Sequence, residues 1–147
     1  MKFLALKHEL KSEPRKVFKE IILAAPDIDA DKFRKEIAPA LAKMPAKTTL
    51  YASSRDIALR ASKRQNGEPR AGDSGKGIVV MKGMETIDAS YVDTSLFWGL
   101  RHSYIADSPA LLSDLFYLLE KKVRAHKRFG LESFVAPNGL TLWRFKQ

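Results

Sequence analysis

Asp56 and His102 are the residues of this chain whose types and positions best fit proton-transfer chemistry. Asp56 follows Thr48–Ser53, a β-branched and aromatic run that predicts a strand, and it precedes a run that predicts a helix. His102 lies in the loop after the next predicted strand. A histidine can take a proton from a nucleophile, and a carboxylate can fix the histidine tautomer and stabilise its cation. The two residues therefore predict the acid and the base of a site that works by nucleophilic catalysis.

Both residues also have an interpretation without chemistry. An aspartate at a strand-to-helix turn is a common helix N-cap, because its carboxylate accepts hydrogen bonds from free backbone N–H groups. The histidine lies between Arg101 and Ser103 and could be an ordinary loop residue. Asp27 follows the preceding predicted strand and is a second candidate for the acid. We favour Asp56 as the acid and keep Asp27 as the alternative.

The nucleophile that such a pair would serve is missing from the sequence. A serine nucleophile must stand on a sharp turn, and no G-x-S-x-G motif occurs in the chain. Residues 72–75 read Gly-Asp-Ser-Gly and superficially resemble the serine motif of the chymotrypsin class, but that class needs a longer, two-barrel β protein. Ser103 is adjacent to the histidine but has no turn motif around it. We therefore expect this chain to lack its nucleophile.

The composition indicates one globular domain without a membrane span. The chain has 147 residues, of which 45% are hydrophobic and 29% are charged. It has no cysteine, which excludes disulfides and thiolate zinc sites, and we assign no residue to a metal or a cofactor. No segment approaches the roughly 20 apolar residues of a spanning helix, and the first apolar run is too short for a signal peptide. We expect a cytoplasmic protein with no membrane partner.

The net charge of +9 raises the question of an anionic partner. The positive residues are scattered, with clusters at 60–64 and 121–128 toward the ends of predicted helices, where cations complement the helix dipole. The sequence contains no Cys/His finger, helix-turn-helix pattern or basic strand rich in aromatic residues. We do not expect nucleic acid as a partner, and binding to nucleic acid or another anionic surface remains the least favoured alternative.

The order of helical and strand patterns predicts an α/β fold with a mainly parallel sheet. We expect strands at 20–25, buried on both faces, at 48–53 and at 78–81, with 85–89 extending or paralleling the third strand. We expect helices at 2–11, 31–41 and 57–65 and a last helix that begins at Ser108–Pro109 and ends at Gly130. Its predicted buried stripe is Leu111, Leu112, Leu115, Phe116, Leu119 and Val123.

The tail of the chain has the pattern of a β-hairpin. Residues 133–136 and 141–145 flank the pair Asn138–Gly139, which favours a type I′ turn. We expect residues 131–147 to form this hairpin as a tail on a domain that spans residues 1–130.

Six sequence blocks, taken together and in order, resemble the C-terminal half of a bacterial α/β-hydrolase family whose members are uncharacterised. The resemblance covers about residues 15–120. It implies a partial α/β-hydrolase fold of three layers, with Asp56 as the triad acid and His102 as the triad base. It also implies that the first strands and the nucleophile elbow would precede Met1. The blocks are residues 22–29, 50–59, 70–73, 85–88, 92–95 and 102–104.

The resemblance and the composition together lead to three hypotheses about function. In the first, the chain is a truncated or split serine hydrolase, esterase-like and acting on a small ester in its complete form, whose serine lies upstream or on another chain. In the second, it is a non-catalytic homodimerising interaction domain. In the third, it is a basic nucleic-acid or anionic-surface binder. A half-sheet exposes an apolar edge, so we also expect a homodimer with the strand at 20–25 near the contact.

Overall fold

The computed structural model describes residues 18–54, 68–92 and 109–147, which build one five-stranded sheet of order β1-β2-β3-β5-β4. β1, β2 and β3 run parallel, and β5 runs parallel to β3. β4 pairs with β5 in antiparallel fashion. The prediction of an α/β fold with a mainly parallel sheet is confirmed. The strands are β1 (Glu20–Ala24), β2 (Lys47–Ala52), β3 (Met84–Asp88), β4 (Leu131–Val135) and β5 (Thr141–Phe145).

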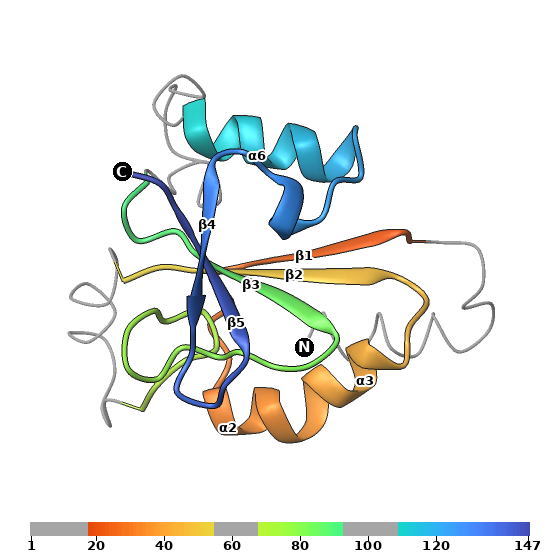
Figure 1. Ribbon diagram of the computed structural model, residues 1–147. Helices are drawn as coiled ribbons and strands as arrows, with labels where there is room; N and C mark the ends of the chain where they lie inside the picture. Colours follow the sequence, from red (N-terminus) through yellow and green to blue (C-terminus); the bar gives the residue numbers. More distant parts are fainter. Residues whose placement is uncertain (1–17, 55–67, 93–108) are drawn as a thin grey trace, which may run out of the picture.

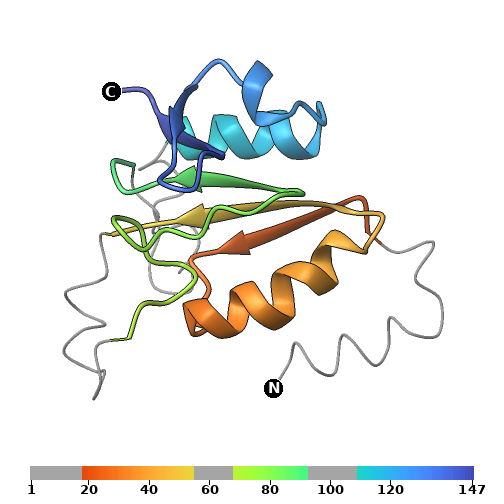
Figure 2. The ribbon, with the colours of Figure 1, turned by 60° about the horizontal axis from the view of Figure 1, so that its bottom comes forward.

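Helices cover both faces of this sheet and give the three layers that we predicted (Figures 1 and 2). α6 (Pro109–Leu119) lies on one face, followed by a short 3-10 helix, η3 (Ala125–Lys127). The other face is covered by a continuous helical segment that begins where Asp29 caps its first turn. That segment comprises α2 (Ala30–Lys32), the π-helical turn η1 (Phe33–Ile37) and α3 (Ala38–Ala42).

The two-residue period of the strands sorts most of the core into two large clusters, one on each face of the sheet, and a third, smaller cluster consists of Val80, Ala136 and Leu142. On the α6 face, Tyr51 and Ile87 pack with Leu111 and Leu118 of the helix. On the opposite face, Leu50 packs with buried residues of the α2–α3 segment. β1 is only half-buried at every position, because no other described strand lies beyond it. It is thus less buried than we predicted.

The third strand begins later than predicted. Residues 78–81 form no strand, and β3 starts at Met84 after a turn in which Gly83 has a φ of +82°. The apolar run is nevertheless partly buried, since Val79 packs in the core and its carbonyl accepts a hydrogen bond from Thr86 Oγ1 at 2.8 Å. Residues 78–81 are therefore apolar because they are partly buried in a loop, and this apolar run resembles that of a strand.

The last helix ends well before Gly130. α6 stops at Leu119, and Lys122 takes a left-handed φ of +54° that turns the chain toward η3. The predicted buried stripe was also partly wrong, because Phe116 and Leu119 are 50% and 48% exposed. Asp114 occupies a buried position of the helix instead.

The C-terminal hairpin forms where we predicted it, but with a different turn. The N–H of Gly139 donates to the carbonyl of Ala136 at 2.9 Å, and Gly139 has a φ of +78°. Asn138 is not among the described residues with positive φ, so the turn is not type I′, which requires positive φ at both central residues. Through β5, which pairs with β3, the hairpin joins the main sheet.

Candidate functional site

The carboxyl edge of the parallel strands is the part of the molecule where the predicted site would lie. Asp56, His102 and Ser103 fall outside the described residues. The segment after β2 is described as far as Ser54, and the segment after β3 as far as Val92. β2 and β3 are neighbours and run parallel, so the two segments that carry the predicted acid and base leave the sheet from the same edge. Ligands of open α/β sheets generally bind at this edge.

A short chain of hydrogen bonds ties the ends of β2 and β3 together. The backbone N–H of Ser54 donates to Ser90 Oγ at 2.9 Å, and Ser90 Oγ donates to Asp88 Oδ1 at 2.6 Å. The N–H of Ser90 donates to the same oxygen at 3.0 Å. Asp88 is buried, and its Oδ2 forms an ion pair with Arg144 Nε of β5 at 3.3 Å. The two segments therefore depart from a fixed point on the sheet.

The loop at residues 70–73 closes the same edge next to β1. Asp27, the alternative acid, is exposed and forms an ion pair with Arg70 Nε at 3.4 Å. The N–H of Gly72 donates to the carbonyl of Pro26 at 3.0 Å, and a Cβ on Gly72 would lie 2.2 Å from the carbonyl carbon of Ala25. Gly72 thus has a structural role, because no side chain fits between this loop and the end of β1.

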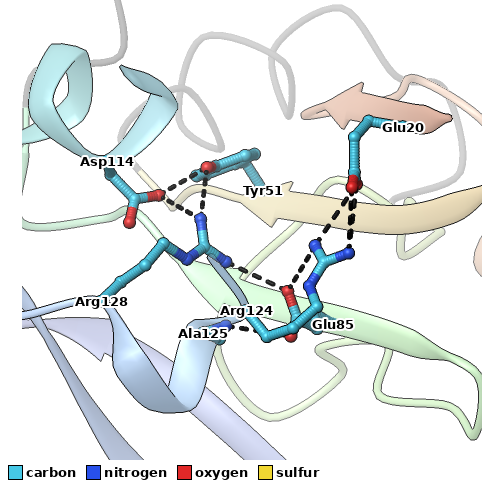
Figure 3. Close-up of polar contacts among 7 residues, drawn as sticks. All are labelled: Glu20, Tyr51, Glu85, Asp114, Arg124, Ala125 and Arg128. Atoms are coloured by element: carbon cyan, nitrogen blue, oxygen red, sulfur yellow. Dashed lines mark hydrogen bonds and ion pairs between the residues drawn. The ribbon is translucent and has the colours of Figure 1, made fainter. Parts of the chain in front are cut away.

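A buried polar cluster lies on the α6 face of the sheet and was not predicted from the sequence (Figure 3). Tyr51 Oη donates to Asp114 Oδ2 at 2.5 Å, and Arg128 Nη1 donates to the same oxygen at 2.8 Å. The side chains of Arg128 and Asp114 are only 1% and 3% exposed. These contacts join β2, α6 and the segment after η3.

Three further ion pairs extend the cluster toward the amino ends of the strands. Glu85 Oε2 lies 3.1 Å from Arg128 Nη2 and 3.1 Å from Arg124 Nη2. Arg124 Nη1 lies 3.2 Å from Glu20 Oε2 at the beginning of β1. The Ala125 N–H donates to Glu85 Oε1 at 3.0 Å. The C-terminal part of the chain is therefore held to three strands by charged hydrogen bonds.

Burial raises two pKa values in this cluster. The pKa of Tyr51 is raised far above its usual value, first because the phenol is buried and then because the Asp114 carboxylate lies beside it. Burial also raises the pKa of Asp114, although Arg128 and the Tyr51 hydroxyl oppose the shift. Tyr51 thus stays a hydrogen-bond donor at all ordinary pH values. The cluster is enclosed by the core, and we interpret it as structural.

Within residues 18–54, 68–92 and 109–147, no group of three or more His, Cys, Asp or Glu side chains could hold a metal ion. Among the helices of the same residues, none has the length and hydropathy needed to cross a bilayer.

The three-layer arrangement around a mainly parallel sheet, with polar side chains at the carboxyl edge, places the protein in the α/β class. The chain belongs to a family described as alpha/beta hydrolase of unknown function (DUF900), whose model matches residues 3–121. No curated protein and no solved structure matches the chain. Arg124, Arg128, β4 and β5 lie beyond the matched residues, so this part of the fold is additional to the family match.

Proposed function

We propose that this chain supplies the acid and the base of a serine hydrolase that acts on small esters or related acyl bonds. His102 is the proposed base, and Asp56 is the proposed acid that orients it. The serine comes from a segment upstream or from another chain, so this chain is the truncated or split part of the complete enzyme. The cytoplasm is the proposed place of the reaction.

One observation carries this proposal, namely the match of residues 3–121 to an α/β-hydrolase family. The sheet supports it, because Asp56 follows β2 and His102 follows β3 in a pair of adjacent parallel strands. In α/β hydrolases the triad residues follow in the order Ser, Asp or Glu, and His. The hydrogen bond from Ser54 to Ser90 fixes the strand ends from which both segments start.

The proposed chemistry is an acyl transfer in two steps. His102 takes the proton of the serine as the hydroxyl attacks the carbonyl carbon, and then gives it to the leaving alcohol. Water, deprotonated by the same imidazole, releases the acid and regenerates the serine. Asp56 stabilises the imidazolium in both steps. Without a serine the chain alone should show little or no hydrolysis, because loss of one triad member removes most of the rate.

Intact-mass analysis after treatment with a fluorophosphonate tests whether the nucleophile is absent. We expect no adduct on the isolated chain. A single adduct that disappears in a His102→Ala variant would show that the site is complete, and mapping it to Ser103 or Ser74 would identify the serine.

Reconstitution tests the roles of the acid and the base. The chain is co-expressed with the product of the coding sequence immediately upstream, and hydrolysis of p-nitrophenyl butyrate is measured. We expect activity that falls at least a thousandfold, as an order-of-magnitude estimate, in His102→Ala and strongly in Asp56→Asn. Asp27→Asn is the matched control and should retain activity. Activity that survives His102→Ala, or that is lost in Asp27→Asn but kept in Asp56→Asn, would contradict the assignment.

A second candidate function is a non-catalytic interaction domain that forms a homodimer through β1. The observation that favours it is the half-buried apolar sequence of Ile21, Ile22 and Leu23 on β1, which is the outermost of the described parallel strands. Edge strands of this kind can pair with another chain. Light scattering at high concentration tests it, and a monomer in both the wild type and an Ile22→Lys variant would exclude this dimer.

A further inference from the structure

Exposed lysines gather at the amino edge of the sheet, opposite to the carboxyl edge. Lys19 precedes β1, Lys47 begins β2, and Lys82 lies shortly before β3. The side chains of all three lysines are exposed. The N–H of Lys47 donates to the carbonyl of Lys19 at 2.9 Å, which places these two residues side by side.

Two helix ends bring further lysines to the same edge. Lys43 follows α3, and a Cβ on Gly83 would lie 3.6 Å from the Cβ of Ala42, so Lys43 and Lys82 are close in space. Lys121 and Lys122 follow α6, and the ion pair of Arg124 with Glu20 brings this segment to the beginning of β1. Figure 1 shows the C-terminal end of α6 and the beginning of β1 on the same side of the molecule.

The charge of these lysines is not neutralised within the described part of the chain. None of the six forms an ion pair with a described residue. Two carboxylates at this end of the strands, Glu20 and Glu85, are already paired with Arg124 and Arg128. Glu120, next to Lys121 in the chain, offsets at most one of the six positive charges. The edge therefore presents free positive charge to a partner.

Large apolar side chains are exposed among these lysines. Phe18 is 45% exposed directly before Lys19, and Phe116 and Leu119 are 50% and 48% exposed at the end of α6. Lys121 Nζ lies 5.5 Å from the centroid of the Phe116 ring, so cation and aromatic ring belong to one surface. Exposed apolar groups close to each other commonly mark an interaction surface.

We propose that this surface, which we call the lysine edge, binds peripherally to an anionic lipid bilayer. Lysine ammonium groups attract acidic headgroups, and aromatic and leucine side chains enter the boundary between headgroups and acyl chains. Nucleic acid would use the lysines but would leave the exposed Phe and Leu side chains without a role. The lysine edge consists of Lys19, Lys43, Lys47, Lys82, Lys121 and Lys122 with Phe18, Phe116, Tyr117 and Leu119.

This proposal revises our expectation that the protein has no membrane partner. That expectation depended on the lack of a spanning segment, and peripheral binding needs none. The proposal is independent of the proposed hydrolase function. It also implies that the carboxyl edge points away from the bilayer, because the two edges lie at opposite ends of the same strands.

Vesicle flotation of the full chain tests the proposal. The vesicles contain either phosphatidylcholine alone or an equal mixture with phosphatidylglycerol. We expect binding only to the mixed vesicles. The variant Lys19→Gln/Lys47→Gln/Lys82→Gln should lower the partition coefficient roughly a hundredfold, since each lysine near an anionic surface contributes about fivefold. The matched control changes three exposed lysines elsewhere, Lys32, Lys35 and Lys76, to Gln and should change the coefficient less than about twofold.

A second variant tests the apolar part of the surface. Phe116→Ser/Leu119→Ser should weaken vesicle binding severalfold without changing retention on a heparin column. The folded state of each variant is checked by circular dichroism. The proposal is overturned by three results: no binding to mixed vesicles, equal loss in both lysine variants, or binding to duplex DNA that depends on the lysine edge while vesicle binding does not.

Discussion

Replacing Arg128 by Met should destabilise the protein more than any change at an exposed residue of the described chain. The Arg128 side chain is 1% exposed and pairs with Asp114 at 2.8 Å and Glu85 at 3.1 Å. Glu85 keeps Arg124, but Asp114 would remain buried without a cation. Removing one partner of a buried ion pair costs about 3–5 kcal/mol, because the other charge is left uncompensated. A domain of this size has about 5–15 kcal/mol of stability in all.

Urea unfolding followed by circular dichroism measures this change. In thermal unfolding, we expect a lower Tm by roughly 6–20 °C, at about 2–4 °C per kcal/mol for a domain near this length. Lys127→Met is the matched control, since Lys127 is exposed and one position away, and it should change stability by less than about 0.5 kcal/mol.

A double variant separates the uncompensated charge from lost packing. Arg128→Met/Asp114→Leu removes both charges and should recover much of the loss, because apolar residues often replace a buried pair at little cost. If Arg128→Met costs less than about 1 kcal/mol, or if the double variant is as unstable as the single one, the reasoning about the buried charge is refuted.

Three further predictions follow from single positions. Gly72→Ala should destabilise by about 1–3 kcal/mol, because its Cβ would lie 2.2 Å from the carbonyl carbon of Ala25; an unchanged urea midpoint would contradict this. Lys122→Gly should raise the free energy of unfolding by up to about 1 kcal/mol, since glycine adopts the φ of +54° without strain. Urea unfolding measures this change, with Lys121→Gly as the control, and an equal change in both variants would argue against strain at Lys122. The pKa of Asp114 is raised in the folded state, so its contribution to stability is greatest below the unfolded pKa and is lost as pH rises through the folded pKa. The free energy of unfolding of the wild type, compared with that of Asp114→Asn, should therefore fall from about pH 4 upward. Urea titrations at several pH values measure both, and a constant difference between the two proteins would disprove the prediction.

Much of the fold could be predicted from the sequence because its signals are local. β1 and β2 are continuous runs of strand-forming residues that end in turn-forming or small residues, and both lie within about one residue of the predicted ranges. The C-terminal hairpin could be predicted for the same reason, because its two strand patterns and its turn residues are adjacent in the sequence. The end of α6 at Leu119 was missed because the left-handed residue that follows it, Lys122, is a lysine, and only a glycine there would have marked the end in the sequence.

The buried cluster could not be predicted because its partners are far apart in the chain. Asp114 interrupts an apolar helical stripe, and that polar residue at a core position was the one available signal. Its partner Tyr51 is 63 residues away, so local periodicity could not show that Asp114 is buried and Phe116 exposed. At the carboxyl edge, Asp56 and His102 remain predictions, while the Ser90–Asp88 contacts had no sequence signal that we recognised.

The position of β5 beside β3 has a consequence for synthesis of the protein. The ribosome makes the chain N-terminus first, at about 5–20 residues per second, so β3 is complete some seconds before β5 can pair with it. During that interval β3 is an open edge, and the partly buried carboxylate of Glu85 has neither Arg124 nor Arg128. The nascent chain therefore passes through a period in which it can associate wrongly, and that period ends only when β5 has been made and pairs with β3.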